Sequence, residues 1–408
     1  MNWFENEMKR LGLSNFLNDY LKREPLFKDK FSLQSNYTPD NIPHREEQIE
    51  ELARILAPSL RMHKPSNVFI YGKTGTGKTC VGQYVVNEIY ETCKKNKVNV
   101  KYYYLNCKLK KVADTEYRLI AQLARGFGES VPATGLPTDE IYKIFVRSID
   151  DKKQLLILIL DEIDQLVNKV GDGILYNLTR LNSELKNSQI SIVGISNDLM
   201  FTDNLDPRVK SSLSEEEVVF PPYNALQLQD ILRERSKIAF LDSSIQEGVI
   251  EKCAAYAARE HGDARRALEL LRVAGELAER DSQMEISIDY IDKAENKIEK
   301  DRVLDIIKTQ PKQFQITLYS ILGYNGSDKL IFTGDIYEDY SKICSMVGLK
   351  PLTQRRVSDI VAELDMLGLI NAKVISKGRY GRTRQISLAI PSSTLPKIKD
   401  VLKEGLGL

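Results

Sequence analysis

In the first half of the chain, segments with the apolar pattern of strands alternate with segments of helical spacing, as in a parallel α/β fold. Runs rich in β-branched, leucine and aromatic residues predict five strands, at 68–71, 100–105, 155–160, 190–195 and 218–220. The segments between these strands have helical or mixed spacing, and that alternation favours parallel pairing. Because every residue of 155–160 is apolar, we expect this strand to be buried on both faces rather than at a sheet edge.

The pattern changes after residue 222. No strand pattern is visible from 223 to 298. One apolar stripe with helical spacing predicts a buried helix face there, formed by Ala267, Leu268, Leu271, Ala274, Leu277 and Ala278. Beyond residue 301, short helices precede two alternating segments, 370–376 and 383–390, which predict a hairpin. We therefore expect an α/β base with a helical leader at 1–222, an all-helical lid at 223–300 and a third domain at 301–408.

The composition describes a folded protein of a reducing compartment. The chain of 408 residues is 42% hydrophobic and 28% charged, which is close to the averages for globular proteins. No apolar run exceeds six residues and the first ten residues carry four charges, so we expect neither a membrane span nor a secretory signal. The five cysteines are far apart and lack zinc-binding spacing. A cytoplasmic protein without a membrane partner fits best.

Positive charge is concentrated near the C-terminus. Residues 301–408 carry a net charge of +5, whereas the first 300 residues carry −4. Within 373–384 no acidic residue interrupts five cations: Lys373, Lys377, Arg379, Arg382 and Arg384. This density suits contact with phosphates. On its own, the run would fit a solvated loop equally well.

The most specific motif is GKTGTGKT at 72–79, which matches the phosphate-loop pattern G-x-x-x-x-G-K-[ST]. It follows a predicted strand and precedes a helical pattern, so backbone N–H groups and a helix N-terminus would surround the phosphates. Lys78 would reach the β and γ phosphates, and Thr79 would bind magnesium. We expect nucleotide contacts from Gly72, Lys73, Thr74, Gly75, Thr76, Gly77, Lys78, Thr79 and Cys80.

Two carboxylates, Asp161 and Glu162, directly follow the apolar strand 155–160. The chain therefore delivers them at the carboxyl end of the sheet, where ligands of such folds bind. Asp161 would hold hydrated Mg²⁺, and Glu162 would polarise the attacking water. A solvated acidic turn is the alternative. Together with the phosphate loop, the pair predicts an ATPase that uses ATP, ADP and Mg²⁺.

Further motifs resemble the AAA+ superfamily and occur in its order along the chain. Asn197, after the strand 190–195, resembles sensor 1, which orients the lytic water; a turn asparagine is the alternative. Arg208 resembles the arginine that acts on a neighbouring subunit's γ phosphate, although a surface arginine remains open. The serine-rich segment after it also leaves open which arginine acts in trans. Arg265, in GDARRA, resembles sensor 2 and would reach the γ phosphate from the lid.

Three shorter segments resemble archaeal DNA replication initiators of the origin-recognition/cell-division-control (Orc1/Cdc6-like) AAA+ family. They are IPHR at 42–45, LDEID at 160–164 and PPY at 221–223. The resemblance extends from residue 37 to residue 390. It implies that the adenine lies against Pro43, His44, Arg45, Tyr223 and Arg235. Without the resemblance, His44 would be interpreted as a surface or capping residue.

The same resemblance implies a helical insert between the second and third strands. Residues 114–145 are long enough to contain it, with Arg118, Arg125 and Lys143 as candidate phosphate contacts.

The C-terminal region has the pattern of a winged helix. In the helical stretch 353–367 the apolar residues fall on one face, which leaves Gln354, Arg355 and Arg356 at the N-terminal turn, where they can contact base edges. The hairpin tip SKGRYGRT adds Lys377, Arg379, Tyr380 and Arg382, followed by Arg384. A helix followed by a basic hairpin favours DNA contact over a solvated loop. Five neutralised phosphates would give a log–log salt slope of about −4.5.

These features predict an ATP-dependent replication initiator that binds double-stranded origin DNA through its winged helix and insert. The resemblance implies recruitment of the replicative helicase, association with the nucleoid, further initiator copies as candidate partners, and ATP binding with slow hydrolysis as a switch. Two alternatives remain open. One is a branch-migration motor with the same three domains, and the other is a transcription regulator whose nucleotide gates DNA binding.

Overall fold

The computed structural model of the chain consists of two compact units, Met1–Ile291 and Asp292–Leu408. The structure describes residues 18, 21, 24–34, 37–39, 41–108, 113–132, 135–213, 215–324, 331–376, 382–390 and 394–408. The boundary between the units falls within one helix, α12 (Ile288–Thr309). Among the described residues, no helix combines the length and apolar character that a membrane span requires.

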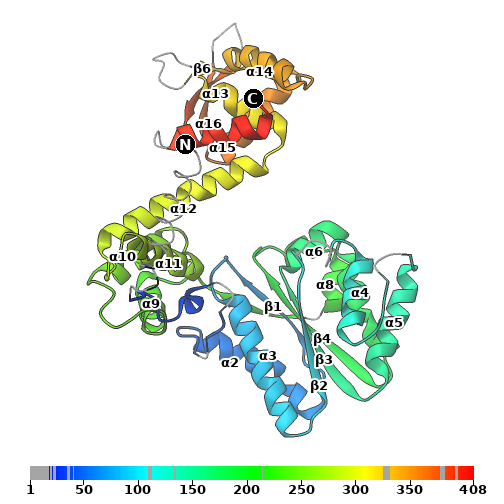
Figure 1. The fold of residues 1–408 in the computed structure, drawn as a ribbon. Coiled ribbons are helices and arrows are strands. Elements are labelled where there is room, and N and C mark those ends of the chain that lie inside the picture. The colour runs from blue at the N-terminus through cyan, green and yellow to red at the C-terminus, as the bar shows by residue number, and fades with distance from the viewer. Residues whose placement is uncertain are drawn as a thin grey trace, which may run out of the picture. The chain divides into compact units, whose positions relative to one another are not determined.

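A parallel sheet forms the centre of the first unit (Figure 1). Within the described residues it has five strands in the order β2-β3-β4-β1-β5: β1 (Asn67–Gly72), β2 (Val100–Asn106), β3 (Gln154–Asp161), β4 (Ser188–Ser196) and β5 (Glu215–Phe220). All neighbouring strands run parallel. The five predicted strands are thus confirmed. Every residue of β3 is buried, as expected for an apolar strand between two neighbours.

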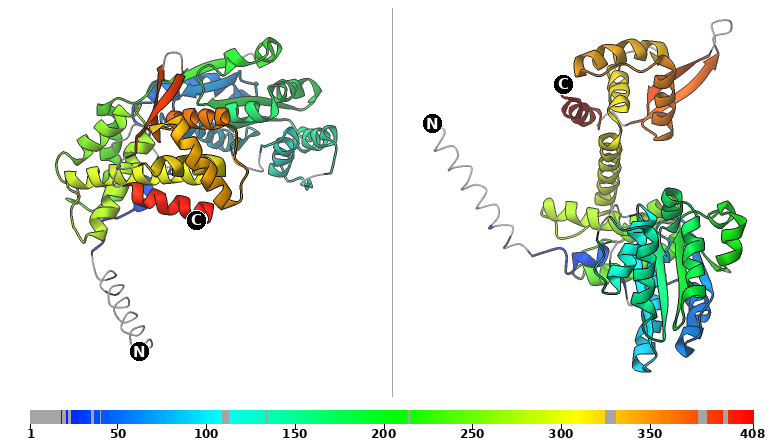
Figure 2. Two further views of the ribbon diagram at one scale, coloured as in Figure 1. Left: turned by 90° about the horizontal axis from the view of Figure 1, so that it is seen from above. Right: turned by 90° about the vertical axis from the view of Figure 1, so that its right-hand side faces the viewer.

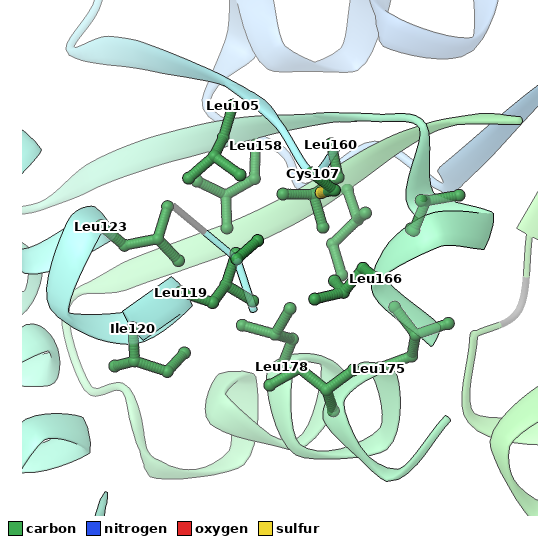
Figure 3. Close-up of a cluster of buried hydrophobic side chains, with 14 of the residues drawn as sticks. Leu105, Cys107, Leu119, Ile120, Leu123, Leu158, Leu160, Leu166, Leu175 and Leu178 are labelled. Atoms are coloured by element: carbon green, nitrogen blue, oxygen red, sulfur yellow. The ribbon is translucent and has the colours of Figure 1, made fainter. Parts of the chain in front are cut away.

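Helices cover both faces of this sheet, because alternate residues of each strand point to opposite sides. On β3, Leu156, Leu158 and Leu160 pack into one core, whereas Leu155, Ile157 and Ile159 pack into the other. The second core includes residues of α2 (Glu46–Leu56) and α3 (Lys78–Lys95). The first core includes residues of α4 (Glu116–Gly126), α5 (Thr138–Asp150), α6 (Ile163–Val170), α7 (Gly173–Glu184) and α8 (Pro207–Leu213). Figure 3 shows side chains of α4, α6 and α7 pointing toward those of β2 and β3.

The strand register brings the carboxyl ends of several strands to one edge. Asn106 of β2 lies opposite Asp161 of β3, and Asp161 lies opposite Ile195 of β4. Tyr71 of β1 in turn lies opposite Ser196. The phosphate loop, the acidic pair and the end of β4 therefore meet at this edge.

Helices α9 (Ala225–Ala239), α10 (Val249–Arg259) and α11 (Ala264–Arg280) form the lid. The described residues of 223–298 contain no strand, only isolated bridges: Ile245 pairs with Ile286, and Phe240 pairs with Phe27 of the N-terminal segment. The predicted stripe on α11 is buried except for Leu277, which is half-buried. The N-terminal segment 24–34 packs on this lid through Phe27 and Phe240, whose ring centroids are 4.7 Å apart.

The second unit packs helices against a small antiparallel sheet (Figure 2). Its elements after α12 are α13 (Lys312–Leu322), β6 (Ile331–Phe332), α14 (Thr333–Val347), α15 (Gln354–Met366), β7 (Ile370–Ser376), β8 (Arg382–Leu388) and α16 (Leu395–Leu406). The predicted helix at 353–367 is α15, and Thr353 caps it by accepting a hydrogen bond from the Arg356 N–H. The predicted second strand of the hairpin, 383–390, extends two residues too far. Strand β6 was not predicted, because two residues cannot display an alternating pattern.

Candidate nucleotide-binding site

A cavity of about 420 Å³ lies at the carboxyl edge of the first unit's sheet. Its volume is within the range of small-molecule sites. The predicted site residues that line it are Pro43, Thr74, Gly75, Gly77, Lys78, Thr79, Cys80, Asp161, Glu162, Asn197, Tyr223, Arg235 and Arg265. Segments far apart in the sequence thus form one site.

Lys78 is held inside this site by three oxygen atoms. Its Nζ donates hydrogen bonds to the backbone oxygens of Gly72 (2.8 Å) and Lys73 (2.7 Å), and to Oδ1 of Asn197 (2.9 Å). The side chain is almost fully buried, with 5% exposed. Burial and the positive charge of Arg265 lower the pKa of Lys78 to about 8. The predicted phosphate lysine and the predicted sensor 1 residue are therefore in direct contact.

The residues predicted to bind magnesium also lie together. The Thr79 hydroxyl donates to Asp161 Oδ2 at 3.1 Å, and the Tyr104 hydroxyl donates to the same oxygen at 2.7 Å. Burial and the Asp161 carboxylate raise the pKa of Tyr104, so this hydroxyl remains a donor. An alcohol and a carboxylate this close are oxygen ligands of the kind that Mg²⁺ prefers, so Thr79 and Asp161 fit this ion.

Glu162 lines the same cavity but has a different partner. Its carboxylate lies 3.4 Å from Nζ of Lys108, which follows β2. Its backbone is left-handed (φ 54°), a conformation that is uncommon for glutamate and is found at functional sites. Asp164, the third carboxylate of the motif, accepts a hydrogen bond from the Ser196 hydroxyl instead. The three neighbouring acids therefore have different partners.

The lid contacts the phosphate loop directly at Gly75. The amide of Ala264 donates to the Gly75 oxygen at 3.1 Å. A Cβ added at Gly75, which has φ 74°, would lie 1.7 Å from Oδ1 of Asp263. The Asp263 carboxylate also caps α11 by accepting the backbone N–H groups of Arg265 and Arg266. Movement of the lid would therefore disturb the loop that surrounds the phosphates.

The two arginines that begin α11 differ in their surroundings. Arg265 lines the cavity, as expected for a residue that reaches a γ phosphate from the lid. The side chain of Arg266 instead pairs with Glu260, with Nε 3.2 Å from Oε2.

His44 and Arg45 do not line the cavity. The His44 ring lies 3.0 Å from the Asp230 carboxylate on α9. Arg45, which is 2% exposed, donates to the backbone oxygens of Thr76 (2.9 Å) and Pro221 (2.6 Å). Its guanidinium also stacks on the ring of Tyr223, 3.8 Å from the centroid. These contacts make Arg45 a buried link between the phosphate loop and the lid junction.

At the expected adenine end, the structure adds residues that the motifs did not reveal. Tyr37 lines the cavity, and the guanidinium of Arg235 stacks over its ring at 4.4 Å. Nη1 of Arg235 is buried and has no hydrogen-bond partner among the described residues. Gln34, Thr38 and Asn41, which are near Tyr37 in the sequence, line the cavity as well. Their sequence carries no nucleotide motif; the N-terminal segment 24–34, which leads to the cavity, packs on the lid.

Strand β2 supplies two further polar residues, Tyr104 and Asn106, to the cavity. Asn106 ends its strand, which is a signal visible in the sequence, whereas Tyr104 reaches the cavity only because β2 pairs with β3.

Arg208, the candidate for action on another subunit, is exposed on α8 and does not line this chain's own cavity.

In the second unit, Gln354, Arg355 and Arg356 are exposed at the start of α15. The guanidinium of Arg356 lies 3.7 Å from carboxylate oxygens of both Asp359 and Glu363. Arg384 is half-buried on β8. Lys377, Arg379 and Tyr380 lie outside the described residues, as does the side chain of Arg382.

The region 114–145, predicted to hold an insert, contains α4 and most of α5. Its three candidate phosphate contacts already have protein partners. Arg118 pairs with Asp114, Arg125 donates to the Val131 oxygen, and Lys143 pairs with Glu140. Phosphate contact there would have to displace or share these partners.

Comparison with known proteins covers all three regions of the chain. The family models that match are an AAA domain at 61–199, the Cdc6 AAA+ ATPase-type lid domain at 229–296 and the CDC6 C-terminal winged helix domain at 305–397. Together with the parallel sheet, they confirm the predicted AAA+ base, helical lid and winged helix.

Similar proteins span nearly the whole chain. An ORC1-type DNA replication protein of Pyrococcus furiosus is 51% identical and is matched over 99% of this chain and 95% of its own length. One from Thermococcus onnurineus is also 51% identical, over 96% of this chain and 94% of its own length. The solved structure of the Aeropyrum pernix ORC1 protein in complex with DNA is 44% identical, with a TM-score of 0.81 over 93% of this chain and 97% of that one.

Proposed function

The chain belongs to the ORC1-type DNA replication proteins, and we propose that it binds duplex DNA at origins under the control of an adenine nucleotide. Membership of this family makes it a replication initiator with an AAA+ ATPase fold. The proposal adds three points to this membership: binding at origins, a nucleotide switch and recruitment of the replicative helicase. Recruitment of the helicase is inferred from family membership alone.

One observation carries the nucleotide part of the proposal. Lys78 from the phosphate loop, Asn197 from β4 and Arg265 from the lid converge on one cavity. Phosphate oxygens are natural partners for such a set of donors. Because Arg265 comes from the lid, a γ phosphate would pull lid and base together, and its loss would release them. ADP and ATP would therefore favour different lid positions.

Within this site the chain's own residues have distinct roles. Bound Mg²⁺ would neutralise phosphate charge in the transition state. Thr79 and Asp161 would hold it, Glu162 would accept the proton of the attacking water, and Asn197 would orient that water. Arg208 would act on the γ phosphate of a second copy.

The DNA part of the proposal rests on the exposed first turn of α15. Gln354 and Arg355 can make paired hydrogen bonds to base edges in the major groove. The Aeropyrum pernix ORC1 protein, which shares this fold, has been solved in complex with DNA. Lys377, Arg379, Tyr380, Arg382 and Arg384 would add backbone contacts. If five phosphates are neutralised, the log–log salt slope is about −4.5, and replacing both Arg379 and Arg382 by alanine should reduce it by about 1.8.

The direct test is a footprint of the purified protein across its source genome's DNA, with ATP and with ADP. We expect protection of a few origin segments that changes with the nucleotide, and loss of that change in Lys78→Ala. A footprint restricted to promoters would support the transcription regulator. Hexamers with fast, DNA-stimulated hydrolysis would support the motor. Identity to ORC1-type proteins along nearly the full chain favours the initiator over both.

A further inference from the structure

Tyr104 is a cavity residue to which none of the motifs assigns a role. It lies on β2 opposite Ile159 of β3, and its side chain reaches the Asp161 carboxylate two positions further along β3. The hydroxyl oxygen is 2.7 Å from Asp161 Oδ2, a short hydrogen bond to a charged acceptor. Tyr104 therefore contacts the residue best placed to hold magnesium.

Three donors fix the orientation of the Asp161 carboxylate. Oδ2 accepts from the Tyr104 and Thr79 hydroxyls, and Oδ1 accepts from the Glu162 N–H at 3.0 Å. The Glu162 N–H belongs to the adjacent peptide, so Tyr104 and Thr79 are the donors that tie the carboxylate to other segments of the chain. Thr79 would also bind the metal ion through its hydroxyl oxygen, so of the two side-chain donors to Oδ2 only Tyr104 is not itself a predicted metal ligand.

We propose that Tyr104 is a positioning residue that orients Asp161 for the hydrated magnesium ion of the nucleotide site. This inference rests on the proposed nucleotide function. Groups that hydrogen-bond to a metal-binding side chain set its direction, and their loss typically reduces metal affinity 10- to 100-fold. Removal of the Tyr104 hydroxyl would leave the contacts between protein and nucleotide unchanged, because this hydroxyl donates to the Asp161 carboxylate.

The same strand provides a matched control. Tyr102 is two residues earlier, so it lies on the same face of the sheet as Tyr104. Its hydroxyl is 3.5 Å from Oδ1 of Asn87 on α3, and it does not line the nucleotide cavity. Replacement of either tyrosine by phenylalanine removes one oxygen and keeps the ring, so both variants should fold.

The experiment compares Tyr104→Phe and Tyr102→Phe in the full chain with two binding measurements. Affinity for a fluorescent ADP analogue is measured in EDTA, and the affinity of the ADP-loaded protein for Mn²⁺ is measured by electron paramagnetic resonance. We expect Tyr104→Phe to weaken Mn²⁺ binding about 10-fold and to leave metal-free ADP affinity unchanged. Tyr102→Phe should match the unaltered protein in both.

A double variant tests whether Tyr104 acts through Asp161. In an Asp161→Asn background, Tyr104→Phe should cause no further loss of Mn²⁺ affinity, because the oriented ligand is already gone. Four outcomes would each overturn this inference without affecting the proposed function. They are unchanged Mn²⁺ binding in Tyr104→Phe, an equal loss in Tyr102→Phe, a parallel loss of metal-free ADP affinity, and additive losses in the double variant. If the unaltered protein binds no adenine nucleotide, the proposed function falls and this inference falls with it.

Discussion

A cation of the nucleotide cavity and a cation at the start of α15 differ in burial and in their protein partners. Lys78 is buried, and three protein oxygens hold its ammonium group before any ligand arrives. Arg355 is exposed, and no ion-pair partner is found for it among the described residues. Folding therefore already includes the free-energy cost of desolvating and ordering Lys78. For Arg355, that free-energy cost would arise only when DNA binds.

The two sites should therefore respond to different conditions. Exposed charges are screened by salt, and buried charges are screened much less. The second unit should therefore lose its ligand as ionic strength rises, while the nucleotide cavity should respond mainly to pH and to substitutions that disturb its internal hydrogen bonds.

The largest effect is expected from Lys78→Ala. The variant loses the cation that would bind two phosphates, which should weaken nucleotide binding by about 4 kcal/mol, or roughly 1,000-fold. Titration with a fluorescent ATP analogue measures this change. Lys95→Ala is the control, because Lys95 is an exposed cation at the opposite end of α3 and does not line the cavity. Similar affinities for the two variants would place the phosphates elsewhere.

The next effect concerns stability and compares a buried arginine with an exposed one. Arg45→Ala leaves the Thr76 and Pro221 oxygens without their donor and should lower the free energy of unfolding by about 3 kcal/mol. Arg355→Ala should change it by no more than about 0.5 kcal/mol. Urea unfolding followed by circular dichroism measures both. Equal stabilities would contradict the role of Arg45 as a buried link.

A third prediction separates two adjacent arginines of α15. Arg355→Ala should weaken binding to the footprinted duplex by about 2 kcal/mol, or roughly 30-fold, because a paired contact to a base is lost. Arg356→Ala should have a smaller effect, since its guanidinium is near Asp359 and Glu363. Fluorescence anisotropy with labelled DNA measures both. An equal loss in the two variants would mean that the contacts are not specific to Arg355.

The smallest effect is the pH dependence of nucleotide binding. Because burial and Arg265 lower the pKa of Lys78 to about 8, the empty cavity holds a neutral amine above that pH. Phosphates favour the charged form, so binding requires proton uptake there, and affinity should fall about tenfold per pH unit above pH 8. Metal-free titrations between pH 7 and 9.5 test this. Lys78→Arg stays charged throughout and should show no such fall; an equally steep fall in Lys78→Arg would assign the titration to another group.

Motifs that are contiguous in the chain were predictable from the sequence alone. The loop 72–79, the acidic pair after β3 and the apolar face of α15 each lie within one short segment, where local geometry fixes how side chains are arranged. The unbroken apolar run 155–160 likewise predicted β3 as an interior strand, because a strand that is apolar at every position must be covered on both faces.

Packing between distant segments determines which residues complete the site. Tyr37 reaches the cavity because the segment before it packs on the lid, and Tyr104 reaches Asp161 because β2 is the neighbour of β3. Likewise, Arg45 is buried against the phosphate loop through its hydrogen bond to the Thr76 oxygen, and it does not line the cavity. Each of these outcomes depends on pairing and packing between segments that are far apart in the chain, and no local spacing records such contacts.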